Sequence, residues 1–252
     1  MFTNLYMHDL HIHWGLPMIE KATGKDWQKI SEISKRSGYE DYINRIGPSY
    51  LDSGTVFTWK ENGEITGFLK IEFLQDNSAW MSGLRVDPDF RRMSMGSHLT
   101  SAAVVCAANS GASYVRMLIH DGNFKSSGLA LKLGFYRVSR FAFFTGIPQG
   151  ESITDPDAGQ ETEIHYLNTG WTFIQYSYAK AAGARYVKFG KHGIAVTVSG
   201  RDYQIINPDH NISLSGEGYT CMEIHGRIPE YFEKSLQKDF DYASVFEKSI
   251  RP

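Results

Sequence analysis

The sequence predicts an α/β (α+β) fold, with a mixed central sheet flanked by helices and a smaller C-terminal α/β domain. Three patterns support this: short apolar runs with hairpin signals, then a β-α-β-α-β order, then a Gly-, Pro- and Asp-rich stretch at 146–160. The chain has 252 residues, 42% of them hydrophobic, which allows one large or two small domains. The domains expected are an N-terminal extension at 1–16, a first domain at 17–147, a linker at 148–160 and a C-terminal domain at 161–252.

The antiparallel part of the sheet follows from turn signals. Asn62-Gly63 is a strong hairpin signal, because both residues tolerate the positive φ of a type I′ turn. Val56–Lys60 should therefore pair with Ile65–Leu74, and Ala79–Val86 should be the third strand of this meander. Upstream, the patterns predict a strand at 18–22, a helix that is entered at 23–26 and ends near Ser37-Gly38, and a second helix near 39–46.

The later elements follow from apolar runs closed by glycines. We expect helices at 97–108 and 124–133 and strands at 114–119 and 136–145. The C-terminal domain should contain strands at 186–189, 194–198, 203–206 and 220–224 and a helix at 230–240.

Composition excludes several classes of function. A net charge of -2 offers no field for nucleic acid or an anionic membrane, and no stretch reaches the roughly 20 apolar residues of a membrane span. Met1–Trp14 lacks the pattern of a signal peptide. Two distant cysteines, Cys106 and Cys221, suggest no disulfide framework or zinc cluster, so an intracellular, cytoplasmic location is expected.

The histidines near the N-terminus do not form a convincing metal motif. His8, His11 and His13 have no cysteine or paired acid at ligand spacing. We therefore expect no metal.

A candidate phosphate-binding loop lies between Leu84 and Leu99. A strand ends, two arginines follow at Arg91 and Arg92, and a helix begins among small residues. Helix N-termini carry N–H donors without internal partners and a partial positive charge, which suits a pyrophosphate. An ordinary helix cap would show the same local pattern.

This loop resembles the acetyl-CoA-binding signature of the GNAT (Gcn5-related N-acetyltransferase) family, with Arg91, Ser94 and Gly96 at its marked positions. Asn123 to Phe135 resembles the family's closing helix, and the resemblance covers about residues 17–145. It implies a GNAT fold with splayed parallel strands, and acetyl-CoA as co-substrate. The residues expected at the cofactor are Leu84, Arg85, Val86, Arg91, Arg92, Met93, Ser94, Met95, Gly96, Ser97, Asn123 and Ser126.

Two positions depart from the family pattern. Ser94 stands where the family usually has glycine, and we expect a negative φ there, which serine adopts at little cost. Ala130 stands where many members have the tyrosine that protonates the departing thiolate. Another group or water must supply that proton, or the activity is lost.

Candidate catalytic side chains are Glu72, as a base, and His120, which follows a strand near the expected splay. Strand alternation should place Phe68, Lys70, Glu72 and Leu74 on one face of their strand, and Trp80, Ser82, Leu84 and Val86 on one face of the next. Glu72 is equally well read as a solvated or ion-paired strand residue.

The resulting hypothesis is an acetyl-CoA-dependent N-acetyltransferase whose acceptor is a primary amine of a small molecule or protein. The alternative is a non-catalytic acyl-CoA-binding or regulatory module, and the sequence leaves open whether the chain forms a homodimer. The C-terminal domain could cap the acceptor cleft. Two groups of aromatic residues could serve packing, a pocket or an interface: Phe141, Phe143 and Phe144, and Tyr166, Trp171, Phe173, Tyr176 and Tyr178.

Overall fold

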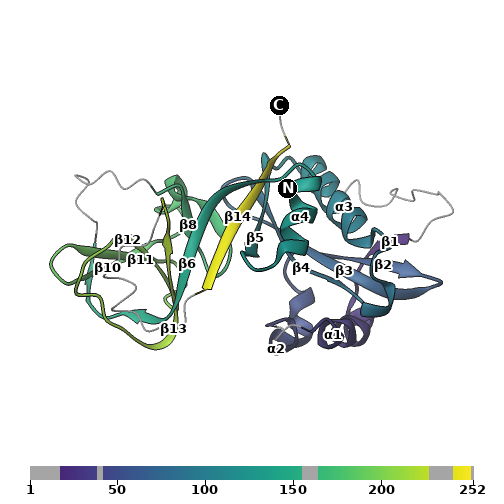
Figure 1. Cartoon of the computed structure of the whole chain (residues 1–252), viewed down its shortest axis with the longest axis horizontal. Coiled ribbons are helices and arrows are strands. Elements are labelled where there is room, and N and C mark those ends of the chain that lie inside the picture. The colour runs from purple at the N-terminus through teal and green to yellow at the C-terminus, as the bar shows by residue number, and fades with distance from the viewer. Residues whose placement is uncertain (1–17, 39–41, 155–163, 227–240, 251–252) are drawn as a thin grey trace, which may run out of the picture.

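The computed structural model describes residues 18–38, 42–154, 164–226 and 241–250. Figure 1 shows two lobes side by side, with the helices α1 to α4 in one lobe and the strands β10 to β12 in the other. The long strand β6 runs from one lobe into the other. No described helix is long and apolar enough to cross a membrane.

The first lobe contains the elements that the sequence predicts. Its helices are α1 (Trp27–Arg36), α2 (Tyr42–Ile46), α3 (Met95–Asn109) and α4 (Phe124–Lys132), with short 3-10 turns η1 (Gly24–Asp26), η2 (Gly47–Leu51) and η3 (Pro88–Phe90). Its strands are β1 (Met18–Lys21), β2 (Thr55–Glu61), β3 (Glu64–Phe73), β4 (Ser78–Val86), β5 (Tyr114–His120) and β6 (Tyr136–Pro148). Asn62 and Gly63 have φ of 50° and 84°, so the hairpin prediction is confirmed.

The second lobe consists of short strands. They are β7 (Glu151–Ile153), β8 (Tyr166–Asn168), β9 (Phe173–Gln175), β10 (Arg185–Phe189), β11 (Gly193–Thr197), β12 (Asp202–Asn207) and β13 (Leu214–Glu223), with the 3-10 turn η4 (Tyr176–Tyr178). The predicted strands at 186–189, 194–198 and 203–206 are confirmed. The predicted helix at 230–240 lies outside the described residues, and β7 falls inside the stretch predicted as a linker.

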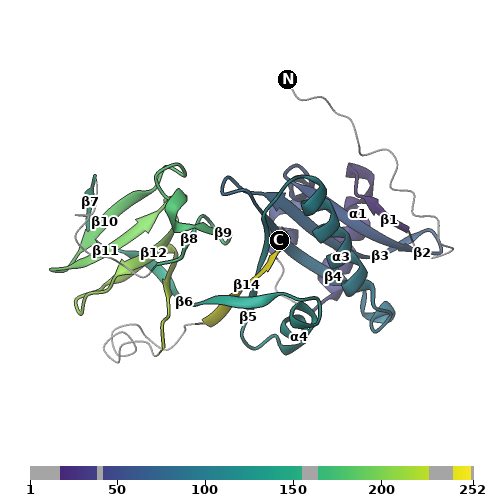
Figure 2. The ribbon, with the colours of Figure 1, turned by 90° about the horizontal axis from the view of Figure 1, so that it is seen from above.

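One sheet runs through both lobes. Among the described residues its strand order is β1-β2-β3-β4-β5-β14-β6-β13-β12-β11-β10-β7, and β8 and β9 form a separate hairpin. Figure 2 shows β14 and β6 between the two groups of strands. The β4–β5 and β12–β13 pairs are parallel.

The strand β14 (Asp241–Ser249) was not predicted. Its residues fall within the range 161–252 expected as a separate domain, yet β14 pairs antiparallel with β5 and with β6. The chain therefore leaves the first lobe along β6, forms the second lobe and returns to complete the sheet of the first.

The two faces of the sheet carry different layers. On one face, α3 and α4 cover a core that includes Leu69, Leu99 and Val115. On the other face, α1 and α2 cover a core around Phe68, and the β8–β9 hairpin covers a core around Trp80. Successive residues of a strand point to opposite faces, which explains why neighbours such as Phe68 and Leu69 serve different cores.

A bulge in β4 breaks the predicted alternation. Lys70 pairs with Ser82 and Phe68 with Arg85, so β4 has one more residue than β3 between these pairs. Gly83 within this bulge has φ 64°. Trp80 therefore faces the β8–β9 hairpin, whereas Leu84 packs toward α3 and α4, and the prediction that both share one face is wrong.

Candidate active site

The strands β4 and β5 separate soon after they begin to pair. Only Ser78 to Trp80 of β4 pair with Tyr114 to Arg116 of β5. Among the described residues, 81–86 of β4 therefore have no strand partner on their β5 side. The backbone groups of this edge can serve an extended ligand in the way a neighbouring strand would.

The start of α3 lies against this edge. Gly96 is in the first turn of α3, and a methyl group in place of its hydrogen would lie 3.3 Å from Leu129 of α4 and 3.6 Å from Leu84 of β4. The structure thus brings the predicted cofactor segments of β4, α3 and α4 together at one point.

The loop before α3 is backbone-strained. Ser94, which precedes the first residue of α3, has φ 59°, and Arg92 has φ 72°. Our expectation of a negative φ at Ser94 is wrong, because the turn into α3 uses the left-handed conformation that glycine adopts most easily. Such non-glycine residues cost about 1–3 kcal/mol each and concentrate at functional sites.

Ion pairs hold the same loop against α1. Arg36 at the end of α1 contacts Asp87 at 2.8 Å and Asp89 at 2.6 Å. Arg91 donates to the backbone oxygen of Ser37 at 3.1 Å. The guanidinium of Arg91 therefore points toward the end of α1, while Arg92 lies exposed beside the start of α3.

The closing segment of the family pattern forms α4. Asn123 caps this helix, with its side-chain oxygen accepting from the Ser126 amide at 3.1 Å. This N-cap is one of the roles that the sequence suggests. Ala130 is only 2% exposed and belongs to the core beneath α4, so no larger side chain fits there without repacking.

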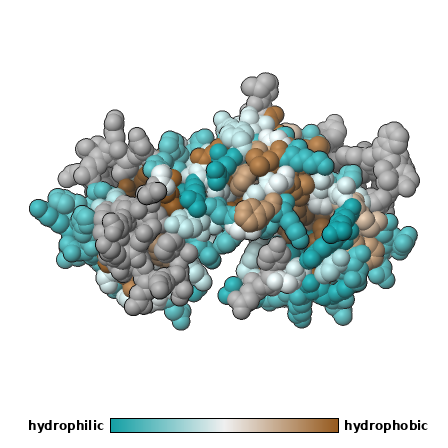
Figure 3. Space-filling view, viewed as in Figure 1, coloured by the Kyte–Doolittle hydropathy of each residue, from teal (hydrophilic) through white to brown (hydrophobic). Residues whose placement is uncertain are grey.

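Apolar side chains gather in the middle of the molecular face in Figure 3, over the region of α3 and α4. Large exposed apolar residues of these elements include Phe124 and Leu131 of α4 and Met93 just before α3. Exposed apolar surface of this kind is typical of a ligand-binding edge.

Glu72 and His120 are not brought together. Glu72 lies on β3, 3.4 Å from the Lys70 amine. The sheet register aligns Glu72 with Trp80 and, through it, with Arg116. His120 lies four residues beyond Arg116, which is roughly 13 Å along the strand. Glu72 thus forms an ion pair, which was one of the two roles expected for it. The catalytic roles of Glu72 and His120 stay predictions.

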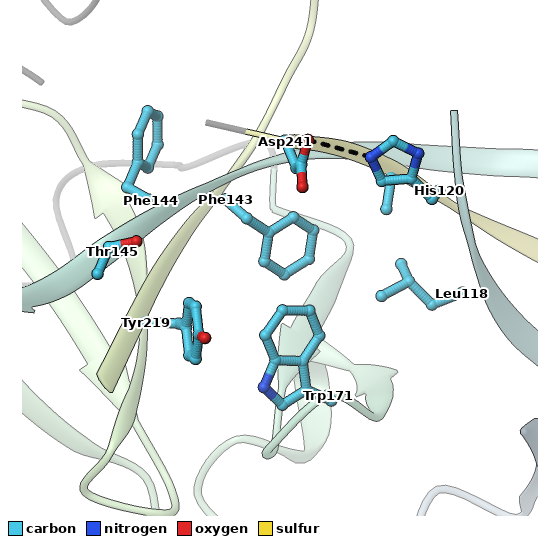
Figure 4. A pocket seen from close by; sticks show the side chains of 9 residues that line it. Leu118, His120, Phe143, Phe144, Thr145, Trp171, Tyr219 and Asp241 are labelled. Atoms are coloured by element: carbon cyan, nitrogen blue, oxygen red, sulfur yellow. Dashed lines mark ion pairs between the residues drawn. The ribbon is translucent and has the colours of Figure 1, made fainter. Parts of the chain in front are cut away.

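His120 lines a pocket of about 220 Å³ between the two lobes. Its Nε2 lies 3.1 Å from the Asp241 carboxylate, and its Nδ1 accepts a hydrogen bond from the Gly122 amide at 3.1 Å. Both side chains of the pair are exposed. The pocket is lined by Leu118, His120, Phe143, Phe144, Thr145, Trp171, Tyr219, Asp241 and Ala243 (Figure 4).

Three aromatic rings form one wall of this aromatic pocket. Phe143 and Trp171 stack with ring centroids 4.9 Å apart and planes 6° apart. Tyr219 meets Trp171 edge-on at 5.2 Å. Figure 4 shows these rings on one side of the pocket and the His120–Asp241 pair on the other. Aromatic faces with a nearby carboxylate suit a cationic group such as an ammonium.

Hydrogen bonds within the turn at 168–172 fix the position of Trp171. Trp171 has φ 65°, an uncommon value for a large residue. The Asn168 side chain accepts from the amides of Gly170 and Trp171 at 3.0 and 2.8 Å, and Thr169 pairs with Thr172. These bonds hold the indole at the pocket despite the backbone strain.

A buried ion network joins the β8–β9 hairpin to the sheet. Arg116 of β5 is fully buried and pairs with Asp76 and with Glu247 of β14, the latter at 2.6 Å. Tyr166 of β8 donates to Glu247 at 3.1 Å, and the Gln175 amide of β9 donates to Asp76 at 2.9 Å.

The charges of this network shift the pKa of its members. Burial alone would raise the pKa of Asp76, but the Ser78 hydroxyl, the Gln175 amide and the Arg116 charge outweigh it and lower this pKa. Burial and the Glu247 carboxylate raise the pKa of Tyr166. Asp76 and Arg116 are therefore charged across the neutral range.

Comparison with known proteins identifies the first lobe. Residues 19–135 match the family model described as the acetyltransferase (GNAT) family. The chain thus carries a GNAT acetyltransferase domain, which begins at β1 and includes the unpaired edge of β4 and the starts of α3 and α4. The family model does not extend to the rest of the chain. No curated protein matches the chain in sequence.

Two solved structures share the fold of nearly the whole chain. A putative acetyltransferase from Pyrococcus horikoshii is 14% identical, with a TM-score of 0.58 over 98% of this chain and 94% of its own. A putative acetyltransferase from Thermoplasma acidophilum is 15% identical, with a TM-score of 0.57 over 92% of this chain and 99% of its own. The arrangement of both lobes is therefore shared with other proteins of this fold.

Proposed function

We propose that the chain is an acetyl-CoA-dependent N-acetyltransferase that transfers an acetyl group to a primary amine of a small molecule or a protein. The observation that carries this proposal is the unpaired edge of β4 beside the start of α3, within a domain of the GNAT family. Further support comes from the surface that would bind acetyl-CoA and from the pocket that would bind the amine.

Acetyl-CoA would be bound mainly by backbone groups of β4 and α3, and less by side chains. The pantetheine arm would pair with the edge formed by Leu84, Arg85 and Val86, where N–H groups can also stabilise a developing oxyanion. The pyrophosphate would meet the first turn of α3, with Arg92 exposed beside it. Gly96 and Ser97, together with Asn123 and Ser126 of α4, would complete this binding surface.

The acceptor end would be the aromatic pocket. Leu118 and His120 belong to the part of β5 that has separated from β4, so the pocket lies beside the gap between these strands. The Asp241 carboxylate attracts an ammonium group, and the rings of Phe143 and Trp171 favour a cation. The acceptor would arrive charged and must lose a proton before it attacks.

Deprotonation of the acceptor sets part of the barrier. A lysine-like amine costs roughly 4.6 kcal/mol to neutralise at pH 7, whereas an α-amino group costs only about 1.4 kcal/mol. The neutral nitrogen attacks the thioester carbonyl, the C–S bond breaks, the newly bonded nitrogen gives its second proton to water, and the thiolate takes a proton. Ala130 is buried in the core, so water is our candidate for the donor of that proton.

His120 is our candidate to receive the proton of the amine. Its Nε2 proton points to Asp241, which leaves Nδ1 as the basic atom, bonded to the Gly122 amide. His120 must exchange this hydrogen bond for the substrate when it acts as a base.

The direct test is to incubate the full chain with acetyl-CoA and a panel of amines while following free thiol, with the acetylated product identified by mass. Turnover of at least one amine is expected. Tight CoA binding without turnover on any amine would favour the non-catalytic alternative, and absence of CoA binding would exclude both.

His120→Gln separates a catalytic from a positioning role. If His120 is the base, kcat falls about 100-fold with little change in the acceptor KM. A change in KM alone would mean that His120 only orients Asp241. Glu72→Gln is the matched control, and it should leave kcat nearly unchanged because Glu72 lies in the Lys70 ion pair.

A further inference from the structure

Three potential metal ligands meet at a place away from the aromatic pocket. His165 precedes β8, and Glu223 and His225 lie at the end of β13. One ligand atom from each residue lies within 4.8 Å of the others. The His165 Nδ1 is 3.6 Å from a Glu223 oxygen, and the two imidazole centroids are 5.7 Å apart.

Glu223 is a buried carboxylate held in one orientation. Its side chain is 3% exposed. One of its oxygens accepts from the Ser139 hydroxyl of β6, and the other accepts from the His165 amide at 3.1 Å. In the described ranges no lysine or arginine forms an ion pair with Glu223. Burial of an ionised carboxylate is costly without a cation, so the site favours a positive partner.

We propose that His165, Glu223 and His225 bind a divalent transition metal of the Zn²⁺ type. Two imidazoles and one carboxylate are a ligand set that zinc accepts, with water as a fourth ligand. Ligands about 2.0–2.1 Å from the ion are roughly 3.4 Å apart, so the histidines need to move by only about an ångström. Both histidines are exposed and free to make this adjustment.

The surroundings fit those of a metal site. Metal-bound carboxylates usually accept hydrogen bonds from further residues, which fix their orientation. The Ser139 hydroxyl and the His165 amide already do this for Glu223. The position was not foreseen from the sequence because His165 and Glu223 are 58 residues apart and follow no recognised ligand spacing.

The metal would have a structural role. Glu223 lies four residues along β13 from Tyr219 of the aromatic pocket, which is roughly 13 Å. His165 is near the start of the described segment 164–226, and Glu223 and His225 are near its end. A metal bound by all three would close this segment into a loop and stabilise the folded form by an amount that rises with the logarithm of its free concentration.

The test uses the full chain after removal of metals with a chelator. Zn²⁺ affinity is measured by competition with a chromophoric chelator, and Co²⁺ reports the coordination geometry by its visible absorption. We expect the wild type to bind Zn²⁺ and its thermal midpoint to rise. His225→Ala and Glu223→Gln should each weaken binding by about 100-fold or more, and Ser139→Ala by about 10-fold.

The control variants distinguish Zn²⁺ binding at this site from Zn²⁺ binding by other histidines of the chain. His192→Ala removes an exposed histidine of the second lobe and should leave affinity unchanged. Replacement of His8, His11 and His13, which lie outside the described residues, should also leave the tight site intact. Equal Zn²⁺ affinity in wild type, His165→Ala and His225→Ala would overturn the proposal, as would absence of binding at micromolar Zn²⁺. The metal-free histidine variants should unfold at the same temperature as metal-free wild type, since both histidines are exposed.

Discussion

The edge proposed to bind the cofactor, here called the cofactor edge, is formed by 81–86 of β4 with the starts of α3 and α4, and it differs from the aromatic pocket in how it is built. The cofactor edge comes from segments less than 50 residues apart, and it offers mainly backbone groups and a helix start. The aromatic pocket takes side chains from β5, β14, β6, β13 and the turn after β8. A site of backbone groups, such as the cofactor edge, suits a ligand that a whole family binds. A site of side chains from many elements, such as the aromatic pocket, suits an acceptor that is particular to one protein.

The largest expected effect concerns the buried network that joins the hairpin beside the pocket to the sheet. Asp76→Asn removes one of the two carboxylates of Arg116 and should cost about 3 kcal/mol of unfolding free energy at pH 7, measured by urea denaturation. The pKa of Asp76 is lowered in the folded chain. Its contribution is therefore complete above its ordinary pKa near 3.8 and is lost as the pH falls through the folded value.

The pH dependence supplies the check on this network. The stability difference between wild type and Asp76→Asn should shrink below about pH 4. Asp209→Asn should show a pH dependence of the same sign, because hydrogen bonds from backbone amides lower the pKa of Asp209. A difference for Asp76→Asn that stays constant down to pH 2 would contradict the charged network.

The strands and the helix start that form this edge were predicted because their signals are local, and cofactor binding there stays a prediction. Asn62-Gly63 specifies a hairpin, and Arg91 to Gly96 specifies a loop into a helix, each within a few residues. The strand β14 gave no such signal, because its partners β5 and β6 lie about a hundred residues earlier in the chain. The aromatic pocket was missed for the same reason, although Trp171 was among the aromatics considered for one.

Local sequence patterns also gave wrong predictions at two positions, where a single residue changes the backbone geometry. The bulge at Gly83 reverses the side-chain alternation of β4, and alternation alone does not reveal a bulge. The sign of φ at Ser94 was predicted from the residue type, whereas the turn into α3 decides it.

An effect of intermediate size, on the KM for the acceptor, is expected from substitutions in the aromatic pocket. Trp171→Ala removes one stacked ring and should raise the acceptor KM about 10-fold while acetyl-CoA affinity stays within a factor of two. Trp171→Phe keeps a ring and should retain most of the affinity for the acceptor. Steady-state kinetics with each substrate varied in turn measures both constants. An equal loss of acetyl-CoA affinity would mean that the two regions are not separate sites.

The smallest effect is expected at the cofactor edge, where Ser94 has φ 59°. Ser94→Gly should relieve the strain and raise the unfolding free energy by about 0.5 kcal/mol, partly offset by the flexibility of glycine in the unfolded chain. Ser94→Ala keeps the strain and removes the same hydroxyl, so it should leave stability unchanged. If the hydroxyl donates to a phosphate of the cofactor, both variants should weaken CoA binding equally, as titration calorimetry would measure. Weaker binding in Ser94→Gly alone would instead mean that the strained backbone, and not the hydroxyl, prepares the loop for its ligand.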